Sequence, residues 1–193
     1  MQRKPHSFGP PSAGPLRAVI VTIDAAKRSG VAIYIEGRLH DYREVKTVED
    51  RERRHVVRDA ITMAEVRGMP LGAVIEVPWI GGHTRAMLSL TSSVTLWRQT
   101  WRAAGRLPEH MLEYTANEWR RALFGTQGMP REQVRRVEAA VASATAIRDM
   151  PHRRHYVLGA DAAAAICIGQ VAIRSGALAS ALGLSRKRKN YTP

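Results

Sequence analysis

The stretch VIEVPWIGG, residues 74–82, places a glutamate near the end of an apolar run and a tryptophan three residues after it. Residues 71–77, LGAVIEV, have the apolar and β-branched composition that predicts a buried strand. A carboxylate in such a strand loses its hydration, and this loss must be offset by pairing or by binding. Because ligands of α/β proteins bind at the carboxyl ends of strands, Glu76 is the first candidate functional residue.

Related patterns predict the elements around this stretch. Residues 16–24, LRAVIVTID, form another apolar run that ends on an acid, Asp24. Two strands are expected in residues 30–47, joined by the turn at Glu36 and Gly37, and one more in residues 110–115. Helical spacing and end signals predict helices at 48–68, 84–104, 117–125, 131–148 and 161–176. Early strands followed mainly by helices predict one α/β domain with a mixed sheet.

The composition indicates a globular protein with a polyanionic partner. Of the 193 residues, 45% are hydrophobic, which is enough for a substantial core. The formal net charge is +13, and 25 of the 30 basic residues are arginine. Arginine binds phosphate oxygens in a bidentate manner, so a nucleic acid is the expected partner. A basic surface that is simply solvated is the alternative.

The sequence argues against a membrane-spanning protein, a secreted protein and a disulfide-bonded or cysteine-based zinc protein. There is no apolar run of the roughly 18 residues that a membrane span needs. Residues 1–15 are rich in proline and glycine and suggest a flexible arm rather than a secretory signal, while residues 181–193 suggest a basic tail. The single cysteine, Cys167, lies in an apolar segment, which predicts core packing, excludes an intramolecular disulfide and argues against a cysteine-based zinc site. A reducing cytoplasm is the expected location, in a bacterial or phage-infected cell.

Three carboxylates stand where apolar elements begin or end. Asp24 and Glu76 end strands, and Asp161 opens the last long helix. If folding gathers them, their mutual repulsion would favour a hard divalent cation such as Mg²⁺ or Mn²⁺. Two such ions can activate water and hold the leaving oxygen of a phosphodiester. A basic protein with an acidic metal pocket suggests a nuclease, although each acid alone could be an ordinary turn or cap residue.

Four motifs, taken in order, resemble the RuvC-like Holliday-junction resolvases of the RNase H-like nuclease superfamily. The motifs read TIDAAKRSGVAIY, VIEVPW, EYTANEWRRALFGTQGMPREQVRRVE and GADAAAAICIG, and the similarity covers about residues 17–177, most of the chain. The resemblance implies a three-layer α/β fold over residues 16–180, with a mixed central sheet and helices on both faces. It also implies a homodimeric, Mg²⁺-dependent endonuclease that cuts four-way DNA by symmetric paired nicks and leaves 5′-phosphates.

The same resemblance assigns roles to individual residues. Asp24, Glu76 and Asp161 would hold the metal, with two ions expected at each site, and Arg131 would lie near the scissile phosphate. Trp79 would meet an unpaired base at the branch point. Charge and position in the sequence, rather than the resemblance, suggest further DNA contacts at His83, Arg85, Lys27, Arg28, Arg120, Arg121 and Arg135. Arg131 could instead be a surface residue at a helix start, and Trp79 could pack under its own loop.

One position departs from the family pattern. The last motif usually offers a second ligand three residues from its aspartate, but Ala164 follows Asp161 at this spacing. The site would then use three carboxylates or recruit another ligand from nearby, for which His155 and Asp149 are the candidates.

A helical stripe within residues 84–104 has two interpretations. Its members are Met87, Leu90, Val94, Trp97, Trp101 and Ala104. The stripe could pack on the sheet. Alternatively, the resemblance implies a two-fold interface at this helix, with Trp97 or Trp101 as an anchor, because two strands of a four-way junction must be cut.

Three other functions stay open at this stage. The chain could be a broader RNase H-like nuclease that cuts flaps, forks or RNA-containing duplexes. It could be a junction-binding protein that has lost catalysis, as Ala164 suggests. It could also be a basic RNA- or ribosome-associated module of the same superfold.

Overall fold

A single mixed sheet organises the computed structural model, which describes residues 16–78, 85–125, 129–153 and 158–184. The sheet has five strands in the order β3-β2-β1-β4-β5. β1 is antiparallel to β2, and β2 to β3, whereas β4 runs parallel to both β1 and β5. The strands are β1 Val19–Asp24, β2 Arg28–Ile35, β3 Arg38–Lys46, β4 Leu71–Val77 and β5 Met111–Thr115.

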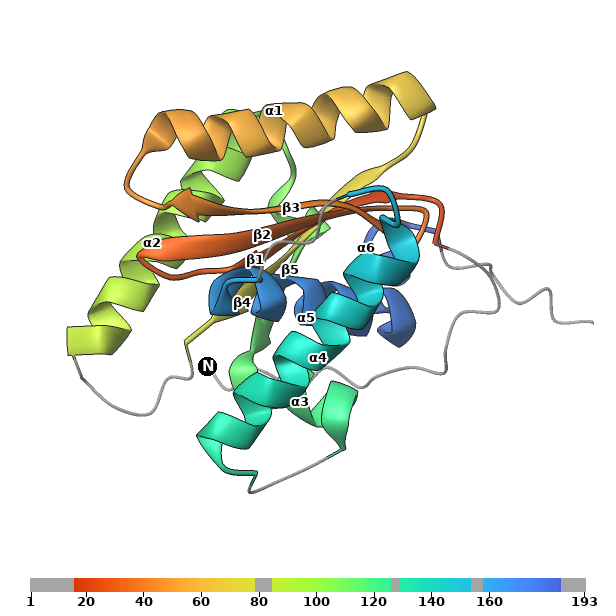
Figure 1. Cartoon of the computed structure of the whole chain (residues 1–193). Coiled ribbons are helices and arrows are strands. Elements are labelled where there is room, and N and C mark those ends of the chain that lie inside the picture. Colours follow the sequence, from red (N-terminus) through yellow and green to blue (C-terminus); the bar gives the residue numbers. More distant parts are fainter. Residues whose placement is uncertain (1–15, 79–84, 126–128, 154–157, 185–193) are drawn as a thin grey trace, which may run out of the picture.

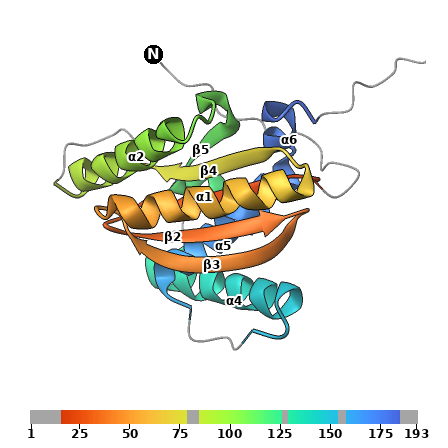
Figure 2. The same cartoon turned by 90° about the horizontal axis from the view of Figure 1, so that it is seen from above.

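Helices cover both faces of this sheet, as the sequence predicts (Figures 1 and 2). One face carries α1 (Asp50–Arg67) and α2 (Arg85–Ala103). The other carries α3 (Ala116–Phe124), α4 (Arg131–Asp149), α5 (Ala160–Ser175) and α6 (Ala177–Ala181). A short 3-10 turn, η1 (Pro108–His110), leads into β5. The predicted three-layer α/β architecture is therefore confirmed.

Alternation along β1 divides the core into two halves. Val19, Val21 and Ile23 pack with α1 and α2, while Ile20 packs with α5 on the opposite face. Thr22 also points towards α5, where its hydroxyl donates a hydrogen bond to the carbonyl of Ala165 at 2.7 Å. A buried hydroxyl needs such a partner, so this bond fixes α5 against the centre of the sheet.

The apolar stripe of α2 packs on the sheet, with its two tryptophans in the core. Trp97 and Trp101 are 0% and 1% exposed, and both belong to the core shared with β1 and α1. The Trp97 indole donates to Ser29 Oγ at 3.0 Å, and the Trp101 indole donates to the carbonyl of Leu107 at 3.1 Å. The expectation that either tryptophan anchors a dimer is therefore wrong.

Small residues allow α5 to lie unusually close to β1 and β2. A Cβ atom at Gly169 would overlap the ring of Tyr34, and one at Gly30 would overlap the backbone of Asp161. The Tyr34 hydroxyl donates to the carbonyl of Ile166 at 2.7 Å, which holds the ring in place. Cys167, in the same helix, is fully buried as predicted, and burial raises the pKa of its thiol to about 12.

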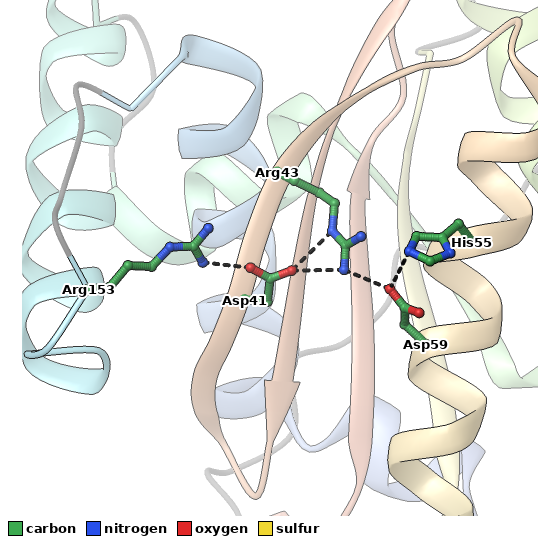
Figure 3. Close-up of polar contacts among 5 residues, drawn as sticks. All are labelled: Asp41, Arg43, His55, Asp59 and Arg153. Atoms are coloured by element: carbon green, nitrogen blue, oxygen red, sulfur yellow. Dashed lines mark hydrogen bonds and ion pairs between the residues drawn. The ribbon is translucent and has the colours of Figure 1, made fainter.

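A chain of ion pairs crosses the outer edge strand, β3 (Figure 3). Arg43 contacts Asp41 at 2.9 Å and Asp59 of α1 at 3.0 Å. Arg153, which follows α4, contacts Asp41 at 2.6 Å, and His55 lies 3.5 Å from Asp59. The network links the two helical layers across β3. Its charges also discourage another strand from adding to this edge.

The C-terminal part of the described chain packs on the same core. α6 ends at Ala181, and Leu182 lies against the cluster that contains α5. Within the described residues, no helix is long and apolar enough to cross a membrane. The arm at residues 1–15 and most of the expected tail, residues 185–193, lie outside the described residues.

Gly169→Ala tests the close approach of α5. Alanine is the better helix former, but its methyl group would overlap the ring of Tyr34, which is fully buried and hydrogen-bonded. Overpacking of this kind costs about 1–3 kcal/mol, so thermal unfolding should show a Tm several degrees lower. Thr95→Ala, on the exposed side of α2, is the control and should leave the Tm unchanged or slightly raised. A Tm for Gly169→Ala equal to that of the wild type would contradict the close packing.

Candidate functional site

Strand pairing brings the first two predicted acids together. β1 and β4 are parallel neighbours, with Thr22 opposite Val74 and Ile23 opposite Ile75. The next residues along the two strands are Asp24 and Glu76, so their carboxylates lie side by side at the carboxyl edge of the sheet. Strand alternation directs both towards the face that α5 covers, because Val74 packs in that half of the core.

The third acid reaches this place through the start of α5. Asp161 lies in the first turn of the helix, and its backbone carbonyl rests against Gly30 of β2. Gly30 is the residue paired with Asp24. The missing side chain at Gly30 therefore allows the first turn of α5 to approach the end of β1.

All three acids line one cavity of about 700 Å³. Arg131, the predicted phosphate-side residue, lines it as well. The remaining lining residues come from α3, α4, α5 and their connections: Asn117, Arg120, Arg121, Phe124, Met129, Val134, Arg135, Glu138, Ala160 and Ala164. Residues far apart in the sequence are thus gathered as the motifs predict.

A fourth acid at this cavity was not predicted from the sequence. Glu138, in the middle of α4, is only 4% exposed, and its Oε1 accepts a hydrogen bond from Arg120 Nε at 2.7 Å. A signal for it exists, because Glu138 shares helical spacing with Val134, Val141 and Thr145, on the side of α4 that faces inward. A glutamate in an otherwise inward-facing stripe is a candidate site residue.

Two neighbouring residues of α3, Trp119 and Arg120, each donate a hydrogen bond to one of the acids. The Trp119 indole donates to Glu76 Oε2 at 2.7 Å. The Arg120 guanidinium lies 4.8 Å from the centre of the Trp119 ring while it pairs with Glu138. The sequence predicts Arg120 as a DNA-backbone contact, but in this structure it serves an internal carboxylate.

Crowding of the acids changes their ionisation. Burial, followed by the charges of Glu76 and Asp161, raises the pKa of Asp24 well above its usual value. Burial also raises the pKa of Glu76, against the opposing effects of the Trp119 hydrogen bond and the Arg120 charge. The pKa of Asp161 is raised by burial and by Glu44. Without a bound cation, the site therefore disfavours full ionisation of its carboxylates.

The donor set suits a hard divalent cation, but its side chains are not yet arranged around one. Among the described residues, none donates a hydrogen bond to the side chain of Asp24 or of Asp161. Carboxylate oxygens facing a polar cavity are the ligands that Mg²⁺ and Mn²⁺ prefer. In the same part of the chain, no three acidic, histidine or cysteine side chains converge on a common metal position. Binding would therefore require side-chain rotations that draw the carboxylates inward.

Arginines border the acidic cavity on the α3 and α4 side. Arg121, Arg131 and Arg135 are exposed and line it. Near the end of β1, Lys27 and Arg28 are also exposed, and Arg28 lies 3.5 Å from Glu44. Cationic side chains thus stand around a cluster of carboxylates, which allows phosphate to approach despite the acids.

Other predicted residues lie elsewhere or outside the described chain. Trp79, His83 and His155 are outside the described residues, and although Arg85 begins α2, its side chain is outside them too. Asp149 is not a replacement ligand. It ends α4, where it accepts from the backbone N–H of Leu39 at 2.9 Å and pairs with Arg148. Eleven residues of helix separate it from Glu138, roughly 16 Å along the axis.

Comparison with known proteins identifies the fold. No protein-family model matches the chain, and no curated protein matches its sequence. The chain is similar to RuvC of T. thermophilus in complex with Holliday junction substrate, with a TM-score of 0.57 and 14% identity. A Thermus thermophilus RuvC structure gives a TM-score of 0.52 and 16% identity, and in both comparisons 86% of this chain and 97% of the other are covered. The chain therefore has a RuvC-like fold, as its motifs predict.

Asp24→Asn tests the electrostatic repulsion in the site. Because the pKa of Asp24 is raised, the folded protein holds this proton at higher pH than the unfolded chain does. Its stability then falls as pH rises through the window from about 4, the usual carboxyl value, to the raised pKa. Asparagine lacks this ionisation, so in EDTA the variant should have a higher Tm than wild type at about pH 8 and lose this advantage towards about pH 4.

The control for this experiment is Glu109→Gln, which removes a carboxylate from the exposed η1 turn away from the cavity. Glu109→Gln should not show the increase in Tm at high pH that is expected for Asp24→Asn. An Asp24→Asn variant that is less stable than wild type across the whole pH range would show that the carboxylate is favourably paired when metal is absent.

Proposed function

We propose that this chain is a metal-dependent, structure-selective DNA endonuclease that acts on four-way junctions. The proposal rests on one observation: acids from β1, β4 and α5 line a single cavity bordered by arginines, within a RuvC-like fold. One of the similar structures is a RuvC bound to Holliday junction substrate, which favours branched DNA over other polyanions.

Asp24, Glu76 and Asp161 would hold the metal in this proposal. When bound, Mg²⁺ or Mn²⁺ would supply an activated water and neutralise charge on the phosphate, with two ions as the expected complement. The Trp119 hydrogen bond fixes one oxygen of Glu76 and leaves the other for a ligand. The chain itself would therefore contribute the three carboxylates, of which Glu76 is held by the Trp119 indole, and the cavity that they line.

Arg131 and its neighbours would bind the DNA backbone. Arg121, Arg131 and Arg135 are exposed beside the acids, so a phosphate held by them would lie next to the carboxylates. A guanidinium in this position stabilises the charge that develops on the phosphate during cleavage. Two protomers, each with one such site, would produce the symmetric nicks with 5′-phosphates that a four-way junction requires.

A second function is favoured by a specific observation. Ala164 lines the cavity where a further acid is expected, and the described side chains do not converge on a metal position. A protein that binds junctions without cutting them would have these features. The cleavage experiment distinguishes the two functions.

Cleavage of an immobile four-way junction, compared with matching linear duplex, tests the proposal. Wild type should nick the junction symmetrically with Mg²⁺ or Mn²⁺ and should be inactive in EDTA. Glu76→Gln keeps an acceptor for the Trp119 indole but removes the charge. Metal-ion stabilisation is worth several kcal/mol, so the variant should be slower by about a hundredfold or more.

Each outcome of this comparison points to one function. Junction binding without cutting under either metal would support the binding protein instead. Cutting of flaps and forks at similar rates would indicate a broader nuclease. Activity that resists EDTA, or that survives in Glu76→Gln, would contradict the proposed site.

The salt dependence of junction binding tests the arginines. Each phosphate contact contributes about 0.9 to the slope of log K against log salt, so Arg131→Gln or Arg135→Gln should reduce the slope by about 1. Fluorescence anisotropy in EDTA would measure binding without cleavage. Arg67→Gln, exposed at the end of α1 on the opposite face of the sheet, is the matched control and should leave the slope unchanged.

A further inference from the structure

We propose that Glu138 of α4 supplies the fourth carboxylate of the metal site and that Arg120 is its counter-ion while no metal is bound. The inference rests on the proposed function, because it concerns the same cavity. It assigns to α4 the ligand that α5 lacks at Ala164.

Glu138 lies inside the cavity that the other acids line. It lines the cavity together with Asp24, Glu76 and Asp161, and its side chain is nearly inaccessible to solvent. Its position in the lining and its burial therefore place it within the site rather than beside it.

α4 and α5 pack against each other beside this cavity. The Cys167 thiol lies 3.5 Å from the backbone carbonyl of Glu138, so these two helices touch at this level. Ala164, almost one turn before Cys167, is buried and also lines the cavity. An alanine here leaves open the space that a longer side chain from α5 would occupy, and the side chain of Glu138 enters the same cavity from α4.

The Glu138 carboxylate is bonded through one of its two oxygens. Arg120 donates only to Oε1, and no described residue donates a hydrogen bond to Oε2. Arginine–carboxylate pairs are frequently bidentate, but this pair uses one oxygen of Glu138. Because Glu138 lines a cavity with three other acids, its second oxygen remains available to a cation. Arg120, itself stacked on Trp119, keeps the charge of Glu138 balanced until a cation arrives.

Mn²⁺ binding to the full chain without DNA tests this assignment, by calorimetry for affinity and by electron paramagnetic resonance for stoichiometry. Loss of even an outer-shell partner weakens metal binding roughly 10- to 100-fold, so Glu138→Gln should weaken it by at least about tenfold. Glu132→Gln is the control, because it removes an exposed carboxylate paired with Arg136 on the same helix. It should bind Mn²⁺ as wild type does.

A double-mutant cycle that combines Arg120→Gln with Glu138→Gln distinguishes a metal-ligand role of Glu138 from a purely structural ion pair. Arg120 competes with the metal for Glu138, so Arg120→Gln alone should tighten Mn²⁺ binding. In the Glu138→Gln background, the same change should have a smaller effect, because the competition no longer exists. A structural pair would instead give a lower Tm for each single variant with equal Mn²⁺ affinity.

The outcomes also separate this inference from the proposed function. If Asp24→Asn abolishes Mn²⁺ binding while Glu138→Gln binds as wild type does, Glu138 is not a ligand and the nuclease site stands. If wild type binds no Mn²⁺, both the inference and the proposed metal site are overturned. Weakened binding in Glu138→Gln, together with unchanged binding in Glu132→Gln, would support the assignment.

Discussion

The close approach of α5 to β1 and β2 is the constraint on which the site depends. Gly30 and Gly169 have no side chain where the helix and sheet meet, and the Thr22 and Tyr34 hydroxyls bond to carbonyls of α5. A larger residue at either glycine would move the helix away from the sheet. Because Asp161 lies in the first turn of α5, any such movement would separate it from Asp24. Core packing and site geometry are therefore set by the same few atoms.

The acids are brought together at an energetic cost. Burial and the charges of neighbouring carboxylates raise their pKa values, which means that the fold holds them in an arrangement they would not adopt unaided. Strands that meet at a buried edge ordinarily end in apolar or turn residues. The unfavourable free energy of placing acids at the ends of two adjacent strands must be offset, and binding of a cation would offset it. Arg120 and the Trp119 indole only partly offset the repulsion, which leaves the site prepared for a further positive charge.

Sequence patterns predict the fold and the central acids because their signals are local. Apolar runs ending on Asp24 and Glu76 identify two strand ends, and the spacing of the four motifs identifies the order of elements. The helical spacing around Glu138 marks the inward face of α4, but its place beside the other acids arises only when α4 packs on α5. Trp97 and Trp101 show a different difficulty, since one apolar stripe fits both a core and an interface. The choice between these depends on how far the sheet extends beneath the helix, which local spacing does not encode.

The C-terminal end of α4 is anchored to the sheet, whereas its N-terminal half carries residues of the proposed site. Its C-terminal end is anchored, because Asp149 accepts from Leu39 of β3 and the following Arg153 pairs with Asp41 of the same strand. Its N-terminal half presents Arg131 and Arg135 to solvent and Glu138 to the cavity. A helix is stiff over this length, so anchoring at β3 fixes where the arginines and the glutamate lie relative to the acids on β1 and β4. One element thereby sets the distance between the proposed phosphate contacts and the proposed metal ligands. The edge strand, although remote from the chemistry, becomes part of what positions it.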